Sequence, residues 1–104
     1  MMNRRVVVTG LGMVSPIGND VASSWQAALE GKSGIDRITA FDASAFGCQI
    51  AGEVKDFDAG KYLGVKEVRR FDRFVHFSVS AGIMALEDSG LEITDEFAPE
   101  CGCA

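Results

Sequence analysis

The residue types best suited to nucleophilic or metal chemistry in this 104-residue chain are three cysteines and one histidine, namely Cys48, Cys101, Cys103 and His76. A structural zinc site needs four ligands, and a nucleophile needs a base within hydrogen-bond reach. His76 lies far along the chain from the Cys101-Gly102-Cys103 pair, and an odd cysteine count is not a secreted disulfide framework. We therefore predict no catalytic residue and no metal site among the four. We interpret His76 as a surface or boundary residue of a helix.

A second candidate is the pattern Gly10-x-Gly12-x-x-Ser15, which follows an apolar segment as a dinucleotide-binding fingerprint would. That fingerprint also needs a second strand ending in an acidic residue about twenty residues later. Here Pro16 follows Ser15 and no second buried strand is apparent, while Glu30 falls at the end of a predicted helix. We therefore interpret Gly10 and Gly12 as structural turn residues.

The third candidate is a cluster of cations at Lys66, Arg69, Arg70 and Arg73, in a chain whose net charge is −5. The apolar pattern places this cluster at the beginning of a long helix, where the macrodipole disfavours positive charge. A solvated helix start is the plain explanation. Positive charge at an unfavourable position instead indicates an anionic partner.

The elements that position these residues follow from the hydrophobic pattern. Residues 6–8 are apolar and β-branched, which predicts a strand buried on both faces. Asp20 then begins an amphipathic helix over residues 20–30 that Gly31 ends. A buried strand running into a capped helix is typical of an α/β layered fold.

The remainder of the chain predicts one further long element. We expect an ordered connection over residues 33–42, a short extended segment within residues 49–57 and a turn or short helix over residues 60–66. A second helix spans residues 66–89 and ends at Gly90. Its small residues predict the close approach of a neighbouring element, and they are Ser78, Ala81, Gly82 and Ala85.

Composition limits the class of protein. An apolar content of 47% supports a real core for one domain, and the net charge of −5 argues against electrostatic binding to nucleic acid or an anionic membrane. The sequence has neither a signal peptide nor an apolar stretch approaching the ~20 residues that span a bilayer. We expect a soluble cytoplasmic protein.

Several ordered blocks resemble the beginning of bacterial β-ketoacyl-acyl carrier protein synthases, and most of all the type II members of this family. The match covers residues 3–96, far more than the glycine pattern alone. The matching blocks are RRVVVTGLGMVSPIGN (4–19), GKSGI (31–35), FDAS (41–44), AGEVKDF (51–57), KEVRRFDRF (66–74) and ALEDSGL (85–91). Trp25 is a further matching residue.

The resemblance implies the N-terminal portion of a thiolase-like layered α/β fold, incomplete here, in an acyltransferase of fatty-acid synthesis. Family members condense acyl groups with malonyl-acyl carrier protein, are usually homodimers and imply no cofactor. Their nucleophilic cysteine and two histidines match none of the four candidates above, so this chain is expected to be inactive alone. In the type II members, the residues matching Lys66, Arg69 and Arg70 face the acidic carrier protein.

The resemblance also divides the chain. Residues 1–96 are expected to form the N-terminal part of the synthase domain, and residues 97–104 to be a divergent, disordered tail of a truncated or frameshifted reading frame. Two other interpretations stay open. One is a small non-catalytic module that binds acyl carrier protein or a full-length synthase, and the weaker one is a nucleotide-binding α/β fragment.

Overall fold

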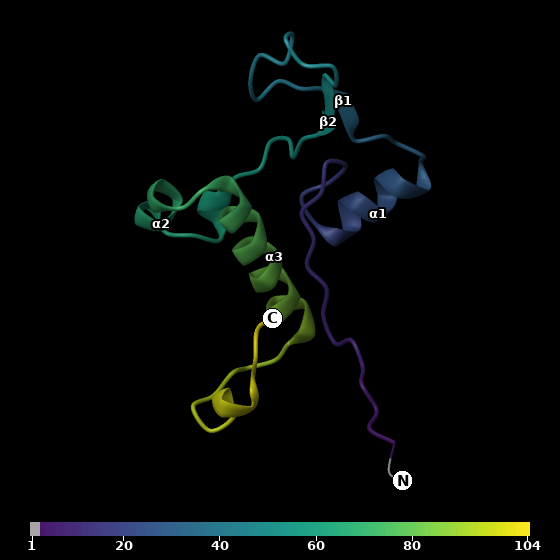
Figure 1. The fold of residues 1–104 in the computed structure, drawn as a ribbon. Helices are drawn as coiled ribbons and strands as arrows, with labels where there is room; N and C mark the ends of the chain where they lie inside the picture. The colour runs from purple at the N-terminus through teal and green to yellow at the C-terminus, as the bar shows by residue number, and fades with distance from the viewer. Residues whose placement is uncertain (1–2) are drawn as a thin grey trace.

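The computed structural model describes residues 3–104, and its elements lie along an open chain rather than around one deep core (Figure 1). Few apolar side chains are buried: Ala27, Ala43, Ala59 and Leu63. None of the helices in residues 3–104 is long and apolar enough to cross a membrane. In chain order the elements are α1 (Val21–Leu29), β1 (Ile35–Arg37), β2 (Ile50–Gly52), η1 (Ala59–Lys61), α2 (Val65–Arg70), α3 (Arg73–Ser89) and η2 (Ala98–Glu100).

The predicted buried strand at residues 6–8 is wrong for this chain. Residues 3–14 run as an extended segment without sheet pairing, and Val6, Val7 and Val8 are 92%, 68% and 79% exposed. Figure 1 shows this segment reaching away from the other elements toward the N-terminus. A buried strand needs neighbours to pair its backbone N–H and C=O groups. The only sheet in the described residues is the β1–β2 pair, which does not include this segment.

The extended segment is held instead against α3 through two glycines. A Cβ atom on Gly10 would collide with the Ala85 carbonyl, and one on Gly12 with the Ala81 carbonyl. The prediction that small residues permit a close approach is thus confirmed at Ala81 and Ala85. It is wrong at Gly82, where a Cβ would meet nothing within 4 Å. Gly10 and Gly12 are close-approach residues rather than turn residues.

The first helix agrees with its prediction at both ends. The Asp20 carboxylate accepts a hydrogen bond from the Ser23 N–H (2.7 Å), which caps α1 and lowers the pKa of Asp20. Beyond the other end of the helix, Gly31 has a φ of 68°, as is typical after a helix C-cap. Before the helix, Ser15 and Gly18 pair across a tight turn.

A small hairpin follows, with Ile35 opposite Gly52 in an antiparallel pair. The extended segment predicted within residues 49–57 is confirmed as β2, whereas β1 lies in the ordered connection predicted over residues 33–42, where no strand was expected. The loop between the strands is fastened by the Glu53 carboxylate, which accepts hydrogen bonds from the N–H groups of Thr39 (3.1 Å) and Ala40 (2.9 Å). These bonds lower the pKa of Glu53.

The single long helix predicted over residues 66–89 is two helices. Phe71 and Asp72 are extended (ψ of 150° and 164°) and separate α2 from α3. Asp72 takes the N-cap position of α3, which aspartate favours, and its carbonyl accepts from the His76 N–H (3.2 Å). The apolar spacing continues from Phe71 to Phe74 across the break, so periodicity alone did not reveal it. The turn or short helix predicted over residues 60–66 overlaps η1 at its beginning and the first residues of α2 at its end.

At the C-terminal end, Gly90 ends α3 with a φ of 65°. The predicted division after residue 96 falls within a turn in which Ala98 N–H donates to the Thr94 carbonyl (2.7 Å). This division stays a prediction.

Candidate functional site

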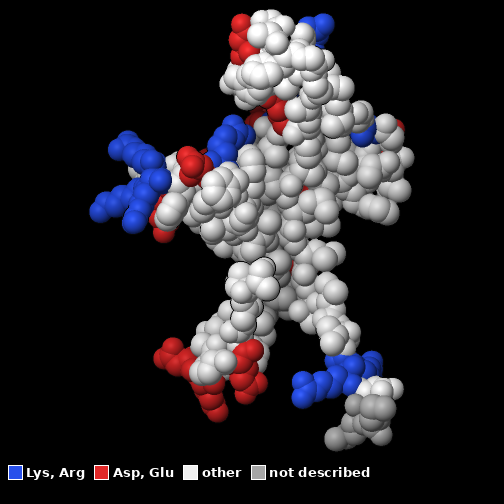
Figure 2. Space-filling model, in the orientation of Figure 1, with Lys and Arg blue, Asp and Glu red and all other residues white. Residues whose placement is uncertain are grey.

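The main candidate site is a group of three exposed cations on α2, Lys66, Arg69 and Arg70, which we call the basic patch. Figure 2 shows basic side chains projecting at the left of the molecule, where Figure 1 places α2. The view also shows acidic side chains gathered on the C-terminal segment lower in the picture, and a few acidic atoms beside the basic side chains of α2. The basic patch is therefore a local feature of a chain with net charge −5.

Local sequence explains why α2 forms and how it presents these cations. The Gly64 N–H, just before the helix, donates to the Glu67 carboxylate (2.8 Å), and the Val68 N–H donates to the Gly64 carbonyl (3.0 Å). A carboxylate in the first turn also complements the helix dipole. Arg69 and Arg70 then fall in the last turn of α2.

The position of Arg69 and Arg70 at the end of α2 corrects the prediction that the helix macrodipole disfavours these cations. That prediction assumed that all the cations sit at the beginning of one helix, whereas Arg69 and Arg70 end a separate helix, where positive charge is favourable. Lys66 in the first turn of α2 and Arg73 at the first position of α3 still oppose the helix dipole, so helix polarity is favourable for two of the four cations only. The exposure of the cations, and their lack of carboxylate partners within residues 3–104, also favour an anionic partner.

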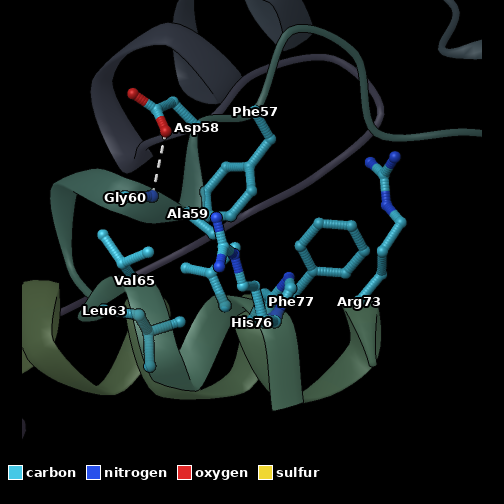
Figure 3. Close-up of a pocket in the computed structure, with 11 residues that line it drawn as sticks. Phe57, Asp58, Ala59, Gly60, Leu63, Val65, Arg73, His76 and Phe77 are labelled. Carbon is cyan, nitrogen blue, oxygen red and sulfur yellow. Dashed lines mark hydrogen bonds between the residues drawn. The ribbon is translucent and has the colours of Figure 1, made fainter. Parts of the chain in front are cut away.

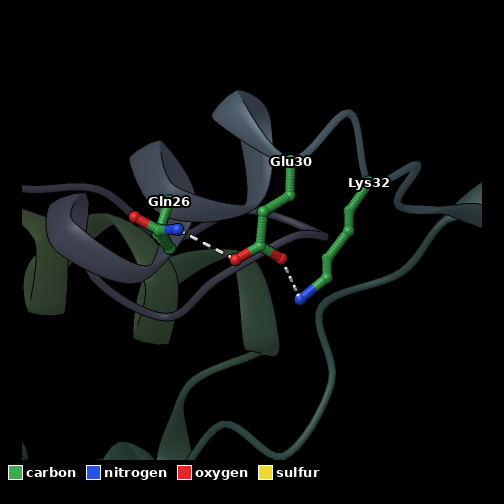
Figure 4. Close-up of polar contacts among 3 residues, drawn as sticks. All are labelled: Gln26, Glu30 and Lys32. Atoms are coloured by element: carbon green, nitrogen blue, oxygen red, sulfur yellow. Dashed lines mark hydrogen bonds and ion pairs between the residues drawn. The ribbon is translucent and has the colours of Figure 1, made fainter.

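The basic patch has no carboxylate partner among residues 3–104. The ion pair within residues 3–104 lies elsewhere, at the end of α1, where Lys32 Nζ contacts Glu30 Oε2 at 2.5 Å. Gln26 Nε2 donates a hydrogen bond to the other Glu30 oxygen at 2.9 Å (Figure 4). Those bonds lower the pKa of Glu30. In the basic patch itself, the Arg70 guanidinium lies 5.6 Å from the centre of the Phe71 ring. The guanidinium and ammonium groups are thus available to an acidic partner.

A pocket of about 410 Å³ adjoins the basic patch, between η1, α2 and the beginning of α3 (Figure 3). Phe57 and Phe77 form part of its wall, with ring centroids 5.2 Å apart in an edge-to-face arrangement. Arg69 of the basic patch also lines the pocket, and so does Arg73. The Arg73 guanidinium lies 5.2 Å from the Phe77 ring centre and donates to the Val54 carbonyl (3.3 Å).

The structure also corrects the interpretation of His76 as a surface or boundary residue. His76 lines the same pocket, is only 9% exposed, and its Nε2 has no hydrogen-bond partner. The reason is that α3 packs against η1, so that the face carrying His76 is covered. The pocket was not predicted from the sequence. The i,i+4 spacing of Arg73 and Phe77 was the available signal.

The three cysteines do not assemble a site with His76. Cys48, Cys101 and Cys103 are exposed, and none of them lines the pocket that contains His76. Within residues 3–104 there is no cluster of three or more His, Cys, Asp or Glu side chains arranged to hold a metal ion. The Ser15 and Ser24 hydroxyls bond each other at 2.8 Å, and Ser24 also donates to the Gly18 carbonyl, so both stabilise the turn before α1.

Comparison with known proteins defines the class of protein. The family model described as "Beta-ketoacyl synthase, N-terminal domain" matches residues 3–104. The chain therefore belongs to the β-ketoacyl synthase family, whose members are acyltransferases of fatty-acid synthesis. Among solved structures it is similar to the ishigamide ketosynthase/chain length factor, with a TM-score of 0.78 and 37% identity over 88% of this chain and 23% of that one. The predicted fold, the N-terminal portion of a thiolase-like layered α/β fold, is confirmed by this likeness.

Particular relatives agree with the predicted branch of the family. The chain is 56% identical over all 104 residues to the 3-oxoacyl-[acyl-carrier-protein] synthase 2 of Vibrio harveyi, and 55% identical to that of Coxiella burnetii. It is 44% identical over 100 residues to the enzyme of the same name from Staphylococcus aureus strain N315. The chain spans about a quarter of the length of these curated relatives, 25%, 25% and 24% respectively.

Proposed function

We propose that this chain supplies the N-terminal part of a 3-oxoacyl-acyl carrier protein synthase. The complete enzyme would be a cytoplasmic homodimer that lengthens an acyl chain by decarboxylative condensation with malonyl-acyl carrier protein, without a cofactor. The observation that carries this proposal is the 56% identity over the whole chain to a relative with that name.

The basic patch gives the chain its own role in that reaction, which is to dock the carrier protein. Lys66, Arg69 and Arg70 are exposed, lie on one short helix and have no carboxylate partner among residues 3–104. A positive surface on a chain of net charge −5 favours an acidic macromolecule at that one place. Charges of this kind act mainly on association rate and on the choice of partner.

Catalysis itself requires residues outside this chain. Nucleophilic acyl transfer needs a nucleophile with a base within hydrogen-bond reach. The cysteines are exposed and none of them lines the pocket that contains the buried His76, so we assign none of the four a catalytic role. The chain by itself is therefore proposed to be inactive.

A chimera tests this function. Residues 1–104 would replace the matching part of the Vibrio harveyi synthase, and formation of 3-oxoacyl-carrier protein would be measured against the unmodified enzyme. Activity within roughly tenfold of that enzyme, about 1.4 kcal/mol in transition-state free energy, supports the proposal. A chimera that folds as a dimer but forms no product contradicts it.

A non-catalytic binding module is the second candidate, favoured by one observation. The helix α2 packs against η1, and η1 packs against α3, so the helix that carries the basic patch has packing neighbours within residues 3–104. Binding of acyl carrier protein to the chain alone, combined with a chimera that is inactive, would favour the module over the synthase.

A further inference from the structure

The pocket beside the basic patch combines apolar walls with unpaired positive charge. Its walls come from η1, α2 and the first turns of α3, and Figure 3 shows the Phe57 and Phe77 rings with Leu63 and Val65 around it. Its volume of about 410 Å³ is within the usual range for sites that take small molecules.

Two of the three charged side chains that line this pocket, Arg69, Arg73 and Asp58, are cationic. Arg69 and Arg73 both line it, and neither forms an ion pair with a carboxylate among residues 3–104. The acidic residue that lines it, Asp58, directs an oxygen to the Gly60 N–H (2.9 Å), as Figure 3 shows. A guanidinium group binds a carboxylate with two parallel hydrogen bonds, so this charge favours an oxyanion.

His76 forms part of the pocket wall and is 9% exposed. Its Nε2 has no hydrogen-bond partner, and solvent in the open pocket does not reach this atom. A ligand in the pocket would therefore pack against the imidazole ring rather than accept a hydrogen bond from Nε2.

We propose that this pocket binds a small carboxylate that carries an apolar group. The carboxylate would pair with Arg69 and Arg73 and lie near His76, while the apolar group would pack on Phe57, Phe77 and the aliphatic wall. The carboxylate of the ligand thus matches the arginines of the pocket, and the apolar group matches its apolar walls. Neither a purely polar anion nor a neutral hydrocarbon satisfies both features.

Binding of octanoate to the ¹⁵N-labelled chain tests the proposal, with acetate and octanamide as matched probes. We expect saturable shifts of the amide signals of α2 and the first turns of α3 with octanoate. Octanamide, which keeps the apolar group and loses the charge, should bind roughly tenfold more weakly. Acetate, which lacks the apolar group, should be weaker as well.

A variant at the rim separates this site from non-specific association. Val65 lines the pocket but is 70% exposed, so Val65→Glu adds a repelling carboxylate with little change in packing. It should weaken octanoate binding roughly tenfold, whereas Val6→Glu, at a residue 92% exposed on the extended segment, should leave it unchanged. Equal binding of octanoate and octanamide, or an equal effect of the two variants, would overturn the proposal. Rapid exchange of the α3 amides would overturn it too, because the pocket would then not exist.

Discussion

Gly12 lies directly against the carbonyl of Ala81, with no room between them for even a methyl group. Gly10 makes the same approach to Ala85, one helical turn further along α3. Between the two glycines, the Leu11 N–H donates to the Asp88 carboxylate at 2.9 Å. These contacts join the N-terminal segment to the longest helix, 69 or more residues away along the chain, and the first prediction follows from them.

Gly12→Ala should loosen the contact between residues 10–12 and α3. The added methyl would overlap the Ala81 carbonyl, and overpacking of this kind costs about 1–3 kcal/mol. Hydrogen exchange of the Leu11 amide should become faster. Gly82→Ala is the matched control, because nothing lies within 4 Å of its Cβ and alanine favours a helix interior by about 0.5–1 kcal/mol. If both variants exchange alike, the close packing at Gly12 is refuted.

The isolated chain should be loosely packed or poorly soluble rather than melt cooperatively. Residues 6–8 are apolar, exposed and unpaired, and such segments associate with one another. We expect α2 and α3, together with η1 on which both pack, to persist while residues 3–9 exchange rapidly. Calorimetry and NMR measure this directly. A sharp melting transition from a monomer with dispersed side-chain signals would show that this prediction is wrong.

The loop between β1 and β2 should lose stability in acid through Glu53. Bonds from Thr39 and Ala40 lower the pKa of this carboxyl from 4.5, so its contribution is complete above that value and is lost as the pH falls through the lowered value. Protection of the Ala40 amide should decline over that acid range. In Glu53→Gln it should be lower at neutral pH and flatter with pH, whereas the exposed Glu92→Gln should behave as the parent chain does. An unchanged Glu53→Gln profile would exclude this role.

The chain alone should form no 3-oxoacyl product from acyl- and malonyl-carrier protein. Its thiols are exposed and lie outside the pocket that holds its histidine, so no nucleophile has a base in reach. Product should equal the background of a reaction without protein. Turnover above that background, lost in Cys48→Ser or in His76→Phe, would contradict the prediction.

Local signals in the sequence predicted the local elements well. The Asp20 cap and the following Gly31 gave α1 almost residue by residue, and the blocks of family resemblance led to the correct fold class. The prediction of a buried strand at residues 6–8 was wrong because a buried strand depends on pairing with other strands, which its own sequence does not describe. The break between α2 and α3 at Phe71 was not predicted, because the apolar spacing typical of a helix continues across it.

The candidate site was only partly visible in the sequence. The basic patch was found from charge alone, but its argument from helix polarity depended on a helix boundary that was wrong. Burial of His76 could not be predicted, because it results from the packing of α3 on η1, two elements separated by α2.

Affinity for acyl carrier protein, measured at low and high salt, is the direct test of carrier-protein docking on the basic patch. The protein would be the folded chimera with the Vibrio harveyi synthase, and the variant Lys66→Glu, Arg69→Glu and Arg70→Glu together. Exposed pairs contribute about 0.2–1 kcal/mol each, so we expect binding roughly tenfold weaker and much less sensitive to salt. Lys32→Glu, Arg37→Glu and Lys55→Glu together change the charge equally away from α2, and should have little effect. Unchanged affinity and salt dependence in the α2 variant would contradict docking of the carrier protein on the basic patch.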